Sequence, residues 1–395
     1  MYSKFTYKLI FVVTRVSTWV GAFCAHFDKN VKLICVTERS QKKFFTSIAI
    51  YLTCMTFLVG GSVKLVISKE GQQSSYYYAT YGVLCLTGIN YCVIATFCSY
   101  FEDLLAVGNR ILTYFPRFAK NWITKSGMVQ VAKYVRVLDF LILLEVLAIG
   151  PAPIPPTLFV FFSPKNPLHP SQFLPGLSDK TGLGWTIFFT MIVSWLACVS
   201  WYSLLVIIMF GTLYAIPFGV VMRELNMETQ TPCAFPALRT PRHLLREYIG
   251  LQVLHTMTVE NVGWMLTLVH SIMSHFILFC NYTILANWDT LDAKTIGILS
   301  FYSFLEQVLW TIVIQIIGMC NSYSIKVLKS WTLVTGRNPK ETKYFKKFSK
   351  SLRPLTVGVR GIMPFTKMTA VKFLRGIITT TFRALLTLVQ KRGGR

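Results

Sequence analysis

The sequence is poor in charged residues and poorest in acidic ones. Only 14% of its 395 residues are charged, and Asp and Glu together number 16 against 40 Lys and Arg. Soluble domains carry about a quarter charged residues, so a chain this apolar is not built for water. Its 53% hydrophobic content and positive mean hydropathy predict a protein embedded in a membrane.

The motifs of most enzyme classes are also missing. The chain has no nucleophile elbow, no glycine-rich phosphate loop, no His-rich box and no Cys or His pair at metal-ligand spacing. We therefore expect neither enzyme activity nor a cofactor. His270 and His275 lie five residues apart on different helix faces, which favours packing or interhelical hydrogen bonds over a metal site.

Long hydrophobic runs are present instead. A helix needs about 20 mostly apolar residues to cross roughly 30 Å of hydrocarbon, where its backbone groups must be satisfied internally. Seven runs qualify. They are Phe44 to Ser68, Ser75 to Tyr100, Tyr134 to Phe162, Gly184 to Val221, Thr258 to Leu285, Thr295 to Asn321 and Ile362 to Gln390.

The predicted fold is an all-α membrane protein with seven transmembrane helices. Residues 1–395 form one membrane domain without a linker or a strong internal repeat. Helices one to six occupy 44–321, with the ligand-binding part in their outer half. A basic cytoplasmic anchor segment follows at 322–361, and the last, pore-type helix covers 362–390.

Amphipathic spacing outside the runs predicts further helices. Met1 to Gly21 is interrupted by basic residues and is expected to lie at the membrane interface rather than to act as a signal peptide. Apolar residues at helical spacing in Arg242 to Glu260 extend the fifth helix, and the sixth continues through Trp331. Tyr344 to Leu352 predicts a short helix, which completes a cytoplasmic helical bundle.

The distribution of basic residues predicts the orientation. The loops that include Phe101 to Lys133 and Ser322 to Gly361 hold 27 Lys and Arg on one side of the membrane, against 7 on the other. By the positive-inside tendency the amino terminus is cytoplasmic and the carboxyl terminus extracellular. Anionic membrane lipid explains the net charge of +24 better than nucleic acid does, so no nucleic-acid partner is expected.

The last run carries polar residues at steps of three or four, which places them on one helix face. They are Lys372, Arg375, Thr379, Arg383, Thr387 and Gln390. Such a stripe cannot face lipid, so it faces either the interior of the bundle or a water-filled path. If it lines a pore, Arg383 must turn aside, pair with an acid or lie in a wide vestibule.

Acidic and aromatic residues within the runs suggest a ligand site. Ionisable residues are costly inside a membrane and are often functional. Glu145 and Glu306 lie deep in their runs and belong either to structural ion pairs or to a ligand cavity, whereas Asp139 is close to a helix end. Aromatic residues cluster in the outer halves of several runs as interfacial anchors or as the lining of an outer pocket.

Two segments resemble the insect odorant and gustatory receptor superfamily. The segment Ser351 to Phe365, followed by Ala370 to Phe382, looks like the segment that leads into the pore helix of that family. Tyr248 to Leu285, with Asn261 and Trp264, is similar to the gustatory branch. The sequence departs from the gustatory ending, which is Thr-Tyr, five apolar residues and Gln-Phe. An alignment anchored on Thr379 puts Leu386 at the Gln place, one anchored on Gln390 puts Ala384 at the Tyr place, and both registers stay open.

The resemblance implies a tetrameric ligand-gated cation channel in the plasma membrane, assembled from identical or related subunits in contact with membrane lipid. A small tastant or odorant would be the ligand, and the last helix would line the pore through Thr379, Arg383, Thr387 and Gln390. In the Gln390 register, Thr387 is the constriction and Gln390 the polar ring at the mouth. The predicted ligand-binding residues are Tyr77, Tyr81, Glu145, Phe189, Tyr302 and Glu306.

Two other classes remain as alternatives. A G-protein-coupled receptor also has seven helices but carries its amino terminus outside, and its usual sequence marks are missing. A secondary transporter could use Glu145 and Glu306 for coupling, although the chain lacks repeats and broken helix pairs. The basic residues of the last run also suggest a hypothesis of obligate heteromers, which homomeric cation channels would contradict.

Overall fold

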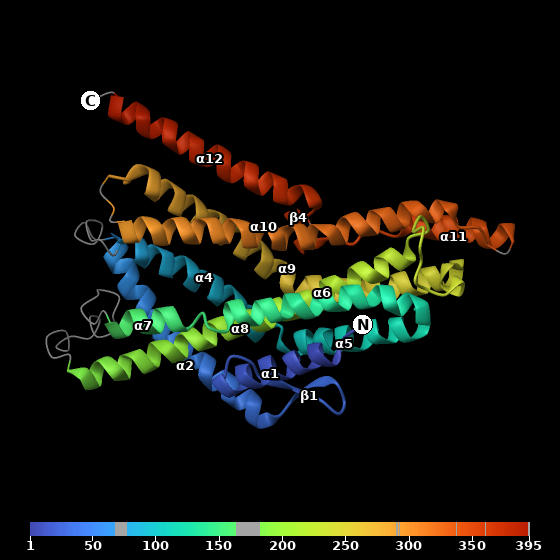
Figure 1. Cartoon of the computed structure of the whole chain (residues 1–395), viewed down its shortest axis with the longest axis horizontal. Helices are drawn as coiled ribbons and strands as arrows, with labels where there is room; N and C mark the ends of the chain where they lie inside the picture. Colours follow the sequence, from blue (N-terminus) through green and yellow to red (C-terminus); the bar gives the residue numbers. More distant parts are fainter. Residues whose placement is uncertain are drawn as a thin grey trace. The chain divides into compact units, whose positions relative to one another are not determined.

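The computed structural model describes residues 1–67, 77–162, 182–289, 291, 293–336, 338–359 and 361–393. Within these residues the chain is almost entirely α-helical, with two short antiparallel hairpins (Figure 1). The residues form two compact units. The amino-terminal unit comprises 4–98 and 141–210, and the carboxyl-terminal unit comprises 1–3, 99–140 and 211–395.

The amino-terminal unit begins with a helix that packs on a hairpin. Its elements are α1 (Lys4–Val20), β1 (Ala25–Asp28), β2 (Leu33–Val36), α2 (Glu38–Ile67), α4 (Tyr77–Ser99), α7 (Ile154–Phe162) and parts of α6 (Lys125–Ile149) and α8 (Leu183–Leu225). The Thr14 hydroxyl accepts a hydrogen bond from the Phe27 N–H at 3.2 Å, so α1 is fixed to β1. The predicted amino-terminal helix is present, and its location at a membrane interface stays a prediction.

The third hydrophobic run is not one continuous helix. Helix α6 ends at Ile149 and α7 begins at Ile154. Between them lie Pro151 and Pro153, and proline disfavours helical backbone in the residue before it while lacking an N–H donor of its own. The Tyr202 hydroxyl donates to the Gly150 carbonyl at 3.4 Å, which satisfies a backbone acceptor at the break.

Five helices of the described chain have the length and apolar composition to cross a membrane. The segments are Glu38–Lys64, Thr80–Ser99, Leu183–Leu225, Pro241–Ala286 and Thr295–Leu333. This confirms an all-α membrane protein. The other two expected crossings, in α6 with α7 and in the last helix, are more polar or shorter, so seven crossings and the sides of the termini stay predictions.

The carboxyl-terminal unit contains a helix that the hydrophobic runs do not reveal. Helix α5 (Phe101–Trp122) occupies a stretch expected to be a loop, and it buries Ile111, Phe115 and Phe118 on one face. The Tyr114 hydroxyl donates to the Glu247 carbonyl at 3.1 Å. Burial, and then the negative charge of Glu247, raise the pKa of Tyr114, so its phenol stays a neutral donor.

The helical extensions expected beyond the fifth and sixth runs are confirmed. Helix α9 (Pro241–Ala286) has 46 residues, and α10 (Ala293–Ser330) continues into the 3₁₀ turn Trp331–Leu333. Helix α11 (Pro339–Ser351) covers the short helix predicted at Tyr344 to Leu352. Trp331 is buried, packs against Tyr248 and Phe345, and donates its indole N–H to the Leu225 carbonyl at 3.0 Å.

A second hairpin precedes the last helix, which therefore begins later in the sequence than predicted. Strands β3 (Val357–Val359) and β4 (Met363–Phe365) pair antiparallel, so α12 (Lys367–Gly393) begins five residues after the expected run (Figure 1). Gly358 has φ of +106°, and a Cβ there would collide with the Met363 carbonyl. Only glycine adopts this turn at low cost.

Gly318 of α10 brings the start of α12 close. A Cβ at Gly318 would lie 2.6 Å from the Thr366 carbonyl oxygen and 2.8 Å from the Lys367 nitrogen. Both atoms belong to backbone, which cannot rotate away as a side chain can. The missing side chain therefore sets the distance between α10 and the turn into α12.

We predict that Gly318→Ala destabilises the protein by about 1–3 kcal/mol, because the added methyl overpacks a backbone contact. The matched control is Gly297→Ala, on the same helix with nothing within 4 Å of the added Cβ. Thermal unfolding of the detergent-solubilised variants checks this. Equal melting temperatures for the two variants would contradict the close approach.

Candidate functional site

Helix α12 is attached to the carboxyl-terminal unit through one face. Ala370, Phe373 and Ile377 are buried at steps of three and four, and they lie on the side that packs against α9 and α10. This face fixes the position of α12 within the unit.

An aromatic layer holds the first turns of α12. The Trp310 indole N–H of α10 donates to Nδ1 of His270 on α9 at 2.8 Å. The His270 ring also lies 5.7 Å from the ring of Phe365 in β4 and 5.5 Å from that of Phe373 in α12. The expectation of an interhelical hydrogen bond at His270 is confirmed, and four elements meet at its ring.

A polar layer holds α12 two turns further along. The Asn281 amide of α9 donates to the Thr381 hydroxyl of α12 at 3.3 Å and accepts from the Ser303 hydroxyl of α10 at 2.6 Å. The Gln307 amide donates to Ser303 at 3.0 Å. Polar side chains in apolar surroundings satisfy one another across helices, so this chain of bonds links α10 to α12 through α9.

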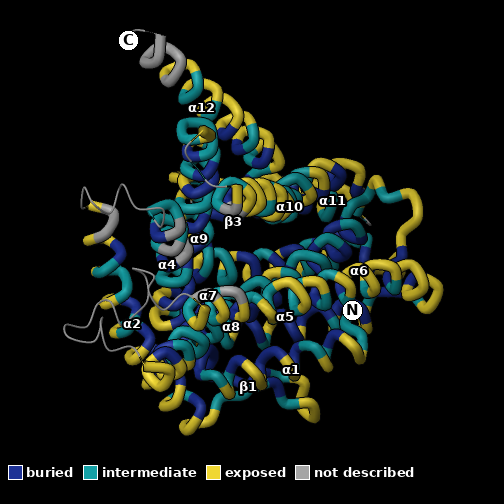
Figure 2. Tube along the Cα trace, turned by 60° about the vertical axis from the view of Figure 1, so that its left-hand side comes forward, coloured by how far each residue is buried: buried dark blue, intermediate teal, exposed yellow. Residues whose placement is uncertain are grey.

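The free faces of α12 differ in chemistry. Exposed polar residues form the stripe expected from the sequence, namely Lys372, Arg375, Thr379, Arg383 and Thr387. Exposed apolar residues lie beside it, namely Val371, Ile378, Phe382 and Leu386. Exposed positions recur along the described length of α12 (Figure 2). Within one chain the described stripe does not face the bundle interior, and its role in lining a water-filled path stays a prediction. The side chain of Gln390 lies outside the described residues.

Four of the predicted ligand-binding residues lie in the amino-terminal unit. Tyr77 and Tyr81 are half-buried on successive turns of α4, and Glu145 is half-buried on α6. Phe189 of α8 is buried, and its ring stacks on Trp185 with centroids 6.0 Å apart. Tyr77 makes an edge contact with Tyr78 at 5.3 Å.

The other two predicted residues lie one turn apart on α10. Tyr302 is 38% exposed, and Glu306 is half-buried. Each directly precedes a member of the polar layer in the sequence, Tyr302 before Ser303 and Glu306 before Gln307. A rotation of this part of α10 therefore changes the predicted ligand residues and the contacts of α12 together.

A second hydrogen-bonded relay fixes the loop that leads to the hairpin. The Nε2–H of His255 donates to the Thr356 carbonyl at 3.0 Å, so Nδ1 is the acceptor for the Tyr214 hydroxyl at 2.6 Å. His255 is buried. This relay and the polar layer were not among the sites predicted from the sequence, although single polar residues inside apolar runs were the available signal.

Comparison with solved structures places this architecture in a known class. The structure of the insect olfactory receptor OR5 from Machilis hrabei matches with a TM-score of 0.65 and 9% sequence identity, over 97% of this chain and 98% of that chain. The same receptor in complex with eugenol matches with a TM-score of 0.67 and 12% identity over the same shares. No protein-family model and no curated protein matches the sequence.

The chain is thus an all-helical membrane protein, and its fold is that of an insect olfactory receptor over nearly its whole length. The resemblance drawn from Ser351 to Phe382 is confirmed at the level of the fold. At these identities the match describes the fold alone.

We predict that Asn281 and Thr381 stabilise the unit cooperatively. In a double-mutant cycle of Asn281→Leu and Thr381→Val, the coupling energy in unfolding should be about 0.6 kcal/mol, typical of hydrogen bonds between membrane helices. Thr379→Val, exposed on the same helix, serves as the control and should show no coupling to Asn281→Leu. Strictly additive effects at Asn281 and Thr381 would show that the bond contributes nothing.

Proposed function

We propose that this chain is a chemosensory receptor that acts as a ligand-gated cation channel in the plasma membrane. The observation that carries the proposal is the match of nearly the whole chain to a receptor fold whose solved relative binds eugenol. A small odorant or tastant is the proposed ligand. The proposed assembly is a tetramer of identical or related subunits, as the sequence resemblance implies.

The surface of α12 supports a pore built from several copies. One face is buried within the chain, the polar stripe is exposed, and an apolar strip lies beside it. An exposed polar stripe is costly in lipid, whereas a water-filled path between subunits satisfies it. The apolar strip then faces lipid or a neighbouring subunit, and Thr379, Arg383 and Thr387 line the path.

The contacts of α10 support a route from ligand to pore. Tyr302 and Glu306 would recognise the ligand, and their neighbours Ser303 and Gln307 bond through Asn281 to Thr381. A ligand that shifts α10 therefore shifts a hydrogen-bonded partner of the pore helix. The roles of Tyr77, Tyr81, Glu145 and Phe189 in recognition stay predictions.

We expect the amino terminus to be cytoplasmic and the carboxyl terminus extracellular. The reason is that most basic loop residues are predicted to lie on the same side of the membrane as the amino terminus. Epitope tags at each end, probed with antibody on intact and permeabilised cells, check this. An amino terminus accessible on intact cells would exclude this topology and favour the G-protein-coupled alternative.

We predict that Tyr302→Ala and Glu306→Gln each raise the half-maximal ligand concentration at least tenfold, which corresponds to about 1.4 kcal/mol of lost interaction. The measurement is whole-cell current evoked by an odorant and tastant panel that includes eugenol, with G-protein signalling blocked. Phe304→Ala is the control, since Phe304 is 70% exposed on the same helix.

The same recordings separate the alternatives. Cation current that persists during the G-protein block supports a channel, and solute uptake without current would favour a transporter. Recording from this chain alone and together with a second receptor subunit tests the heteromer hypothesis, which homomeric cation current would contradict.

A further inference from the structure

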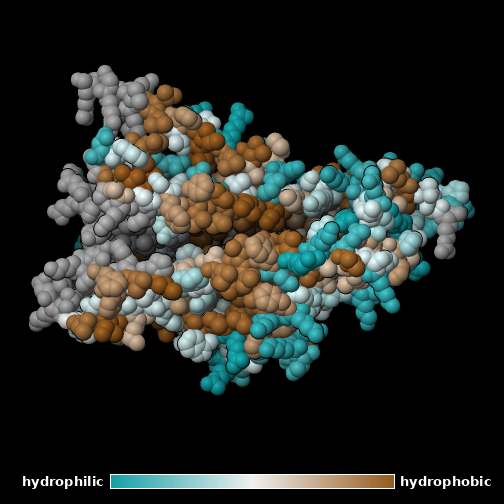
Figure 3. Space-filling model, viewed as in Figure 1, coloured by the Kyte–Doolittle hydropathy of each residue, from teal (hydrophilic) through white to brown (hydrophobic). Residues whose placement is uncertain are grey.

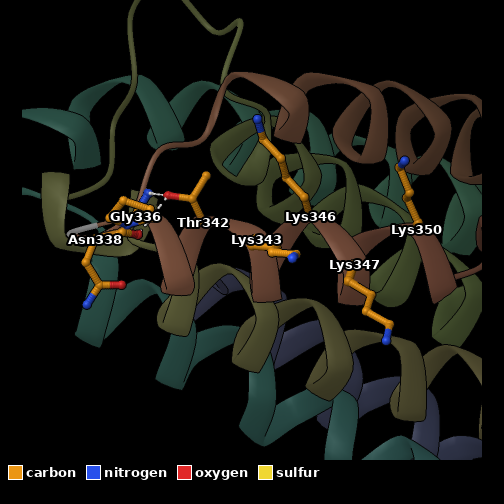
Figure 4. A pocket seen from close by; sticks show the side chains of 8 residues that line it. Gly336, Asn338, Thr342, Lys343, Lys346, Lys347 and Lys350 are labelled. Carbon is orange, nitrogen blue, oxygen red and sulfur yellow. Dashed lines mark hydrogen bonds between the residues drawn. The ribbon is translucent and has the colours of Figure 1, made fainter.

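Helix α11 carries a stripe of four lysines. Lys343, Lys346, Lys347 and Lys350 follow steps of three and four, so they share one side of the helix (Figure 4). Phe345 points to the opposite side, where it is buried and packs on Trp331 with ring centroids 5.4 Å apart. The packed side fixes which way the lysines face.

The start of α11 is rigidly built. The Asn338 side chain caps the helix by accepting the Glu341 N–H at 2.7 Å, as N-cap residues commonly do. The Thr342 hydroxyl accepts the Gly336 N–H at 2.8 Å and donates to the Asn338 carbonyl at 3.1 Å (Figure 4). The turn before the helix is therefore held against the same side as the lysines.

A hollow lies over these lysines. Its volume is about 750 Å³, and it is lined by the four lysines together with Gly336, Asn338, Pro339 and Thr342. A second hollow of about 600 Å³ shares Lys346 and Lys350 and adds Lys329, with Leu328 and Trp331 among its apolar lining. Among the residues that the structure describes, neither lining contains an acidic one, and the first hollow has the size of a small-molecule site.

The charges of the stripe are not balanced within the chain. None of the four lysines forms an ion pair with another residue of the described ranges. Like charges at steps of three and four destabilise a helix. A stripe on an ordinary solvated surface would carry interspersed acidic residues, whereas the charged residues in the described lining of this hollow are all lysines. Hydrophilic side chains gather at the end of the molecule where α11 lies (Figure 3).

We propose that this hollow binds the headgroup of a phosphorylated inositol. Each lysine Nζ is a mobile point donor that suits phosphate oxygens, and four of them match a ring that carries several phosphates better than one isolated phosphate. Basic clusters on an amphipathic helix that follows a membrane helix are typical of phosphoinositide recognition. A membrane phosphoinositide and a soluble inositol phosphate present the same chemistry, and the site takes either.

The test is the melting temperature of the detergent-solubilised full chain, titrated with short-chain phosphatidylinositol bisphosphate and, separately, with inositol hexakisphosphate. We expect saturable stabilisation that weakens as salt rises. The variant Lys343→Gln, Lys346→Gln, Lys347→Gln and Lys350→Gln should lose at least tenfold in affinity. Inorganic sulfate at equal ionic strength should give no saturable effect.

The matched control replaces four other exposed basic residues by Gln, so that it has the same net charge as the α11 variant. Its substitutions are Lys120→Gln, Lys125→Gln, Lys133→Gln and Arg136→Gln. It should bind like the unaltered chain. Equal losses of affinity in the two variants would show that binding depends only on net charge and would overturn the proposal. The absence of binding by either probe would overturn it as well. Stabilisation by the lipid probe alone or by the soluble probe alone supports the site and identifies the source. Because no current is measured, the outcome is independent of the proposed channel function.

Discussion

The arrangement of the carboxyl-terminal unit depends on the packing of the chain's last segment against one stripe of residues on α9. Each of its five residues contacts one residue later in the chain, and the contacts follow the same order along both segments. The pairs are Tyr248 with Arg353, His255 with Thr356, Gly263 with Gly358, His270 with Phe373, and Asn281 with Thr381. Spacings of seven, eight, seven and eleven residues keep these five on one face of a helix. The described residues 353–359 and 361–381 therefore run along α9 rather than across it. The hairpin, the aromatic layer and the polar layer contact this face of α9 one after another along its length.

This arrangement makes α12 an element with three distinct sides. The buried side is set by α9 and α10, so the polar and apolar sides have defined directions rather than free rotation. A polar side in a membrane needs water or a partner, and an apolar side needs lipid or another chain. The charge of Arg383 within the polar side is compatible with cation flow only where the path is wide or where other subunits contribute fewer positive charges. The proposed pore between subunits and the proposed gating route both depend on these directions.

The long helices could be predicted from the sequence because burial in lipid demands about 20 apolar residues, a strong and local signal. Helix α5 could not be recognised in that way, since its apolar face covers one side only and proline and basic residues interrupt the run. The hairpin was missed because strands of three residues have no measurable alternation. In the candidate site, the polar stripe of α12 followed from helical spacing. The α9 stripe did not, because its residue types differ and only their partners define it.

The order of contacts along α9 also has a consequence for how the protein is made. The docking surface formed by Gly263, His270 and Gly318 is synthesised before the segment that it receives, because α9 and α10 precede the hairpin in the chain. The hairpin and α12 can therefore dock from one end to the other onto helices that are already in place. Until that happens, the His270 ring and the Asn281 amide lack their partners from Phe365, Phe373 and Thr381. During biogenesis the newly inserted chain thus presents an unfilled polar and aromatic track, the kind of surface that membrane chaperones and quality control can bind.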